Sequence, residues 1–181
     1  MKKILLVIFS LGLLTQLSAQ KYLTQTGTIR FFSKTPLEDI EAFNNQVSGV
    51  LNADNGEIAF TLLMKAFNFE KALMQEHFNE KYVESHKFPK STFKGKIIDF
   101  NKSSLTDKPR EVMIQGTLTI HGISKEISVK GTLEKTKSGI SGRSVFTINI
   151  KDYNIKVPSA VRKNIADTIE INVNMNYEKM D

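Results

Sequence analysis

Apolar and polar residues alternate along most of this chain, most clearly between residues 111 and 133. Successive side chains of a β-strand point to opposite faces, so a period of two predicts strands with one apolar face. A turn sequence at residues 121–125 divides this segment into a hairpin. Gly116 and Gly131 take apolar positions in the alternation, and glycine inside a strand marks a bend, a bulge or a close approach. Two long half-apolar strands with glycine bends indicate a sheet that curls into a barrel.

Six further segments carry the same signal, which brings the prediction to about eight strands. They are residues 22–32, 43–53, 57–67, 91–100, 140–153 and 169–177. Strand and helix patterns do not alternate along the chain, so the sheet is expected to be antiparallel. The pattern therefore predicts an all-β protein built around an antiparallel β-barrel.

One segment, residues 68–82, changes period. Phe69 and Leu73 are four residues apart, as are Met74 and Phe78, and this spacing places each pair on one side of a helix. Asn68 is the expected N-cap. We expect a short helix here that packs against one end of the barrel. The polar segment 158–166 is expected to be a loop with a short helical turn.

The first 19 residues have the features of a secretory signal peptide. Lys2 and Lys3 precede an apolar run at residues 4–14, and Leu17-Ser18-Ala19 suits cleavage. An uncleaved anchor is the alternative, but the apolar run is shorter than the ~20 residues of a spanning helix. We expect residues 1–19 to be a signal peptide, residues 20–181 to form one domain, and the protein to be periplasmic.

Composition narrows the class of protein. The chain has no cysteine, so neither disulfides nor a lipid-modified cysteine is available. Removing Lys2 and Lys3 leaves 23 basic and 19 acidic residues, a net charge of +4 that is spread over most strands. This argues against nucleic-acid binding and allows a weak attraction to anionic lipid head groups.

Several sequence segments, in their order and spacing, resemble the YceI-like family of periplasmic lipid- and polyisoprenoid-binding proteins. They are FPKSTFKGKI at residues 88–97, GTLTIHGISK at 116–125, the strands at 146–155 and 167–175, and MQEHF at 74–78. The resemblance implies an extended lipocalin-like barrel with an apolar cavity that holds an amphiphile with a long isoprenoid tail. The chain departs from the family pattern at Lys151-Asp152-Tyr153, where an arginine-aspartate pair is frequent, and at residues 156–158, which lack a glycine-rich loop.

Thirteen aromatic and aliphatic residues are the candidate ligand-binding set. They are Phe31, Phe60, Leu62, Met64, Phe69, Leu73, Phe78, Phe93, Ile97, Ile114, Leu118, Phe146 and Ile148. The alternative is that they fill a solid core, because an eight-stranded barrel is just wide enough for side chains or for one small ligand. The resemblance favours a cavity.

Polar candidates are fewer. Arg30 and Arg143 are the head-group candidates, because a guanidinium binds phosphate in bidentate fashion, although an outward solvated charge is the simpler interpretation. The three histidines lack the spacing of a zinc site, and His121 in the hairpin turn is expected to be exposed. No metal and no cofactor is expected. No nucleophile elbow, catalytic cysteine or phosphate loop is present, so an enzyme is not expected.

The first functional hypothesis is a non-enzymatic periplasmic carrier for an amphiphilic lipid, either an isoprenoid quinone or a polyprenyl phosphate. Transient membrane contact would accompany this role, and a homodimer is compatible with the chain. The second hypothesis is a solid-core barrel that docks an envelope partner without a lipid ligand. A third, a hydrolase or isomerase acting on a lipid, requires a titratable group with a perturbed pKa inside the barrel.

Overall fold

The computed structural model describes residues 20–180, which form nine strands and one short α-helix. The strands are β1 (Lys21–Lys34), β2 (Asp39–Asn52), β3 (Glu57–Leu63), β4 (Asn68–Phe69), β5 (Lys90–Ile97), β6 (Arg110–Ile120), β7 (Ile123–Lys135), β8 (Gly139–Asn149) and β9 (Thr168–Lys179). Helix α1 (Ala72–His77) continues into a π-helical turn, and 3-10 turns lie at Met64–Ala66, Lys102–Ser104, Ile150–Tyr153 and Ser159–Val161. The predicted signal peptide at residues 1–19 lies outside the described residues.

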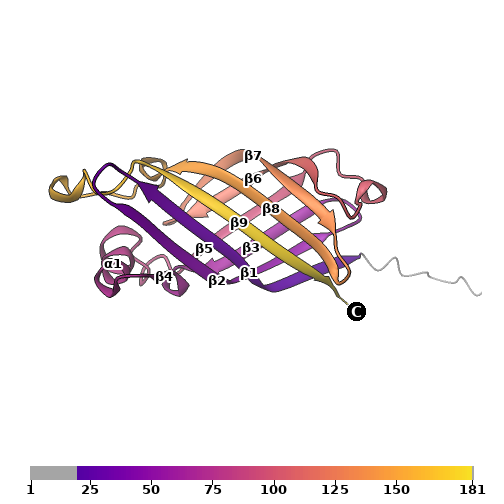
Figure 1. Cartoon of the computed structure of the whole chain (residues 1–181), viewed down its shortest axis with the longest axis horizontal. Helices are drawn as coiled ribbons and strands as arrows, with labels where there is room; N and C mark the ends of the chain where they lie inside the picture. Colours follow the sequence, from indigo (N-terminus) through magenta and orange to yellow (C-terminus); the bar gives the residue numbers. More distant parts are fainter. Residues whose placement is uncertain (1–19, 181) are drawn as a thin grey trace, which may run out of the picture.

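Eight of these strands close into an antiparallel barrel. The strand order is β1-β9-β8-β7-β6-β5-β3-β2, and β1 also pairs with β2, so the sheet has no free edge along the barrel wall. The short β4 pairs only with β2, at Ala42 and Phe43, near one end of the barrel. Figure 1 shows α1 and β4 together at that end, with the C-terminus at the other. The predicted all-β antiparallel barrel of about eight strands is confirmed, as is the short helix at its end.

Gly116, one of the two glycines expected to mark a bend, a bulge or a close approach, marks a close approach. Gly116 on β6 lies opposite Gly95 on β5, and a Cβ atom on Gly116 would fall 2.4 Å from the Cα of Gly95. The Phe93 ring covers this pair, with its Cζ 2.8 Å from the same Cβ position. Phe93 in turn stacks on Phe60 of β3, with 5.2 Å between ring centroids. Absence of side chains at two paired positions therefore makes room for an aromatic ring inside the barrel.

The helix begins later than the periodicity predicts. Asn68 and Phe69 form β4, and the helix starts at Ala72 after Lys71 as its N-cap residue. The Asn68 side-chain amide donates to the backbone carbonyl of Ala66 at 3.2 Å, which supports a turn in place of an N-cap. The predicted start at Asn68 is wrong because the backbone of this segment is taken up by pairing with β2.

The prediction that His121 is exposed is wrong. Its side chain is only 8% exposed, and the edge of its ring packs against Phe88. Nδ1 lies 3.1 Å from the backbone carbonyl oxygen of Tyr153, and Nε2 lies 3.1 Å from Oε2 of Glu84. The hairpin turn is therefore not a free tip, because His121 fastens it to the segments after α1 and after β8.

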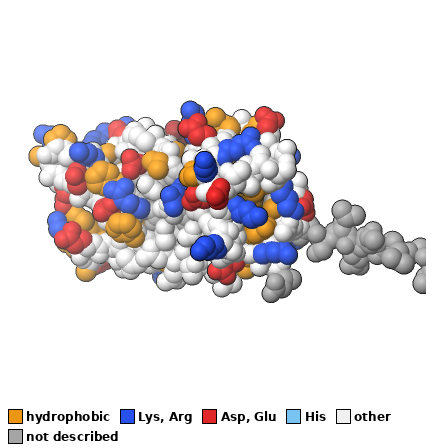
Figure 2. Space-filling model, turned by 45° about the vertical axis from the view of Figure 1, so that its right-hand side comes forward, with side chains coloured by type: hydrophobic (Ala, Val, Ile, Leu, Met, Phe, Trp, Pro, Cys, Tyr) orange, Lys and Arg blue, Asp and Glu red, His pale blue; other side chains and the backbone are white. Residues whose placement is uncertain are grey.

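The outer surface carries mixed charge. Basic and acidic side chains are interspersed over the face of the molecule seen in Figure 2. Within residues 20–180, no helix is both long and apolar enough to cross a bilayer.

Candidate functional site

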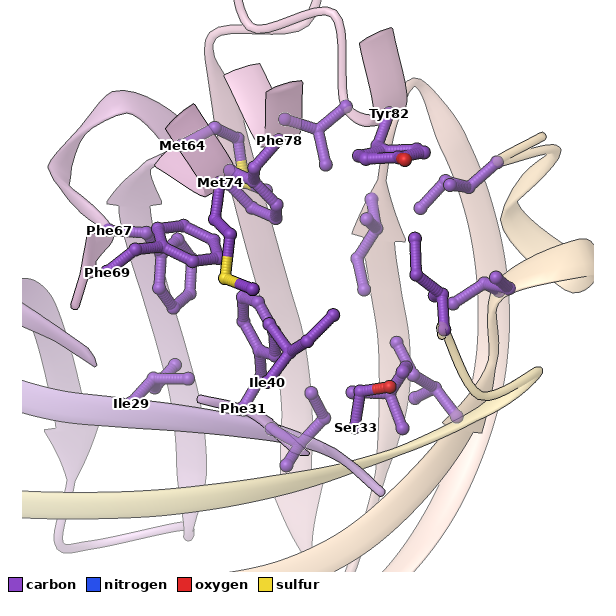
Figure 3. A pocket seen from close by; sticks show the side chains of 18 of the residues that line it. Ile29, Phe31, Ser33, Ile40, Met64, Phe67, Phe69, Met74, Phe78 and Tyr82 are labelled. Atoms are coloured by element: carbon purple, nitrogen blue, oxygen red, sulfur yellow. The ribbon is translucent and has the colours of Figure 1, made fainter. Parts of the chain in front are cut away.

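A cavity of about 380 Å³ lies in the barrel at the end covered by α1. Strands, the segment from Met64 to Val83, and the loop around residue 160 all contribute to its lining. Of the 31 lining residues, 24 are Ile, Leu, Val, Met or Phe, and Figure 3 shows several of these side chains converging on the open space. The site is therefore an apolar pocket that favours a non-polar ligand.

Four phenylalanines fix the segment around α1 to the barrel at one side of the cavity. Phe31 of β1 lies 5.5 Å from each of Phe67, Phe69 and Phe78, measured between ring centroids. Phe78 also lies 5.0 Å from Phe69 and 5.5 Å from Phe67. Such aromatic contacts add to the energy of burial, so the covering segment is held by packing and not only by backbone bonds. Figure 3 labels all four rings and Met74 beside them.

The mouth of the cavity is marked by lining residues that remain exposed. Leu73 is 61% exposed and Val161 is 36% exposed, and both border the cavity. Glu38 also lies at this border and accepts hydrogen bonds at 3.2 Å from both Asn164 Nδ2 and Lys71 Nζ. The Asn164 bond, with the help of Lys71, holds the pKa of the Glu38 carboxyl below its usual range. Three segments that are distant in sequence thus meet at one carboxylate.

Polar groups deeper in the cavity are few and mostly engaged. Ser33 Oγ accepts from the backbone N–H of Ala166 at 2.9 Å, and Ser91 Oγ donates to the carbonyl of Thr119 at 2.7 Å. Burial raises the pKa of Tyr82, whose ring lines the cavity (Figure 3). Together with His77, Tyr82 is available to a polar group of a ligand.

No cluster of three or more histidine, aspartate or glutamate side chains suited to a metal ion occurs within residues 20–180.

The structure brings most of the predicted ligand-binding residues to one place. Ten of the thirteen line the larger cavity: Phe31, Phe60, Leu62, Met64, Phe69, Leu73, Phe78, Leu118, Phe146 and Ile148. The other three, Phe93, Ile97 and Ile114, line a second cavity of about 60 Å³ that shares part of its wall with the first. Their contact with a ligand stays a prediction.

The two head-group candidates lie elsewhere. Arg30 points away from the larger cavity, where it pairs with Glu41 and, at 3.2 Å, with Glu170. Arg143 borders only the smaller cavity, and its side chain is 62% exposed and lies 3.6 Å from Glu134. The structure therefore brings neither guanidinium to the mouth.

Sequence reasoning missed part of the lining. Phe67 directly precedes the predicted helix at residues 68–82, and Met74 lies within it. Val157 directly precedes the segment interpreted as a polar loop, and Val161 and Ile165 lie in that segment. The last three are spaced four residues apart, which is the one signal that this loop turns an apolar side inward. Nothing local distinguishes Glu38, Lys71 and Asn164 from other surface residues, because only the fold brings them together.

Comparisons with known proteins agree with this architecture. No curated protein sequence matches the chain closely enough to count as a relative. Among solved structures, a polyisoprenoid binding domain from Saccharophagus degradans, implicated in plant cell wall breakdown, superposes with a TM-score of 0.78. It shares 15% identity, over 90% of this chain and 100% of that one. BcnA of Burkholderia cenocepacia gives a TM-score of 0.69 at 15% identity, over 82% of this chain and 94% of that one.

The YceI protein of Campylobacter jejuni has a TM-score of 0.56 and 16% identity, over 100% of this chain and 99% of that one. At such identities the likeness establishes the fold alone. The family match is independent of it, since the YceI-like domain matches residues 21–177, nearly all of the barrel. The chain therefore belongs to the family of YceI-like domain proteins.

Proposed function

We propose that this protein is a non-enzymatic periplasmic carrier for an amphiphilic lipid, with the tail of an isoprenoid quinone or polyprenyl phosphate held inside the barrel. The observation that carries the proposal is the cavity of about 380 Å³ with its overwhelmingly apolar lining. The relative from Saccharophagus degradans, described as a polyisoprenoid binding domain, supports the same ligand class. A barrel with this much open space argues against the alternative of a solid core that only docks a partner.

The physical chemistry of such a cavity favours exchange over storage. Burying a methylene group from water contributes about 0.8 kcal/mol, but a bilayer interior offers the tail the same gain. Transfer between membrane and barrel is then nearly neutral for the tail. Contacts with the head group decide the preference. Lys71 and Asn164 lie at the mouth, where both bind Glu38, and His77 and Tyr82 also line the cavity.

Membrane contact would take place at the mouth. Leu37, next to Glu38, is 64% exposed, and Leu73 is 61% exposed. The loop from residue 156 to 163 adds Val161 and three basic side chains without an acidic one. Exposed apolar tips with nearby basic residues suit a brief encounter with an anionic lipid surface.

The cavity gives little support to catalysis. The hydroxyls of Ser33 and Ser91 are engaged by backbone groups, and neither has a basic side chain as a hydrogen-bond partner. A nucleophile needs such a base, so a hydrolase mechanism has no support at either hydroxyl. The periplasmic location rests on the signal-peptide features of residues 1–19.

Lipid uptake from vesicles tests the proposal. The purified protein, stripped of lipid, is incubated with vesicles that contain ubiquinone or undecaprenyl phosphate, re-isolated and extracted. The wild type is expected to carry lipid, whereas Ile148→Trp, which fills the cavity, is expected to carry little. Val145→Trp is the control, because Val145 lies on the same strand but is 56% exposed. Equal loading of both variants, or no loading of the wild type by either lipid, would contradict the proposal.

A further inference from the structure

We propose that the smaller cavity is the inner end of the ligand site, and that Phe60 and Phe146 form the gate between it and the larger cavity. The inference rests on the proposed function, because it concerns the length of lipid chain that the barrel accepts. Phe60 and Phe146 would then control how long a lipid chain the barrel accepts.

The positions of the two rings carry the argument. Phe60 on β3 and Phe146 on β8 each border both cavities. In the closed barrel, β3 and β8 are four strands apart in either direction, so the two residues lie on opposite walls. Side chains that point inward from opposite walls of an eight-stranded barrel meet in its interior. The third shared residue is Val173, on the strand beside β8.

Both gate residues have room to move. Phe60 and Phe146 are only partly buried, because open space lies beside them. Phe93, which lines the smaller cavity but not the larger one, is only 2% exposed. Phe60 is held on one side by its stack on Phe93. A change of rotamer at either gate residue would join the two cavities without moving the backbone.

The sizes and linings explain why an inner end is needed. Pockets that enclose drug-sized ligands span roughly 300–1,000 Å³, so the larger cavity holds only part of a long isoprenoid tail. The smaller cavity extends the site away from the mouth and is lined by well-buried Leu51, Ile97 and Leu133.

Isoprenoid alcohols of increasing length test the gate. Geraniol, farnesol and geranylgeraniol, with two, three and four isoprene units, compete with a fluorescent apolar dye for the lipid-free protein. Phe60→Leu and Phe146→Leu shorten the gate while keeping it apolar. Each is expected to raise the affinity for geranylgeraniol relative to farnesol by about tenfold, which is ~1.4 kcal/mol.

Two further variants make the outcome specific. Adding Ile127→Phe to Phe60→Leu fills the inner cavity and should return the affinity ratio to the wild-type value, because Ile127 lines that cavity alone. Phe43→Leu is the control, since Phe43 is 43% exposed on β2 and should leave the ratio unchanged. If one gate variant does not fold, the other, on the opposite wall, carries the same test.

The possible failures are distinguishable. An unchanged ratio in the folded gate variants would overturn the gate while leaving the proposed function intact. If the affinity ratio stays raised after Ile127→Phe is added, the additional isoprene unit lies outside the inner cavity, and this result would also overturn the gate. If the wild type binds none of the three alcohols, the proposed function fails, and the gate fails with it.

Discussion

The ammonium nitrogen of Lys71 lies 3.2 Å from Oε1 of Glu38, and this ion pair joins the residue before α1 to the loop between β1 and β2. Asn164 binds the other carboxylate oxygen of Glu38 at 3.2 Å. The three segments around the mouth of the cavity are therefore tied through one side chain. Because exposed ion pairs contribute little to folding, the tie is expected to affect how fast ligand leaves more than how stable the barrel is.

The rate of ligand release should depend on pH through Glu38. Its partners lower the pKa of the carboxyl, so the tie is complete above the ordinary glutamate range, about pH 4, and is lost as the pH falls through the lowered value. Release of a fluorescent lipid, measured by stopped flow, should become severalfold faster as the pH falls through the lowered pKa of Glu38. Glu38→Gln should release fast at neutral pH and show no acceleration, while Glu57→Gln, on an exposed carboxylate of β3, should behave as wild type. A Glu38→Gln protein that keeps the wild-type profile would exclude the tie as the cause.

The phenylalanine cluster should contribute strongly to stability. Phe67 is 5% exposed and contacts Phe31 and Phe78. Phe67→Ala should lower the free energy of unfolding by about 3 kcal/mol in urea titrations, because it leaves a cavity among aromatic rings. The exposed Phe43 is the comparison, and Phe43→Ala should change the free energy by less than about 0.5 kcal/mol. Equal effects of the two substitutions on the free energy of unfolding would contradict a strong contribution of the cluster to stability.

Gly116 should not tolerate a side chain. A Cβ at this position would lie 2.4 Å from both the Cα of Gly95 and the carbonyl oxygen of Lys94, so backbone must shift. Gly116→Ala is expected to cost about 1–3 kcal/mol of unfolding free energy. At Gly142 the nearest atom to an added Cβ is the end of the Leu133 side chain at 3.2 Å, so Gly142→Ala should be nearly neutral. If calorimetry finds the two variants equally stable, the close approach of β5 and β6 does not constrain the barrel.

His121 should be structurally important although it lies in a turn. His121→Ala removes the partner of the Tyr153 carbonyl and of Glu84. Loss of buried hydrogen-bond partners costs about 1–3 kcal/mol, so a clear drop in melting temperature is expected. His86→Ala, at an exposed position only two residues beyond Glu84, should leave the melting temperature unchanged. A His121→Ala variant with the wild-type melting temperature would show that the turn does not depend on these contacts.

The exposed leucines at the mouth should speed transfer to membranes. Leu37→Ser with Leu73→Ser should slow lipid delivery to anionic vesicles severalfold, since both side chains are more than half exposed beside the cavity. Affinity for a soluble short-chain alcohol should change little in Leu37→Ser alone, because Leu37 does not line the cavity, and this comparison separates docking from binding. Val145→Ser, on the barrel wall, should deliver lipid at the wild-type rate. Delivery that is unaffected by the leucine substitutions would mean that the mouth does not contact the membrane.

Much of the fold could be predicted from sequence because its signal is local. Alternation with a period of two assigns each residue to the inner or outer face, and ten inner-face and helix residues named in advance line one cavity. The errors fall where the structure depends on partners distant in sequence. Asn68 has the composition of a helix cap, but pairing with β2 makes it part of a strand. His121 lies in a turn, but segments more than 30 residues away bury it.

The polar side of the site was less predictable for the same reason. Arg30 and Arg143 have suitable chemistry for a phosphate, but alternation alone does not say which partners a charged residue meets. The fold pairs them with glutamates and brings Glu38, Lys71 and Asn164 to the mouth instead.

The carrier function is tested most simply by native mass spectrometry of the protein purified from its own cells, followed by organic extraction and lipid analysis. A stoichiometric adduct is expected whose mass and extract identify an isoprenoid lipid, and this adduct should be absent from Ile148→Trp. A bare protein mass that stays bare after incubation with quinone and with polyprenyl phosphate would contradict the carrier function. That result would favour the alternative function, a barrel that docks an envelope partner without a lipid ligand.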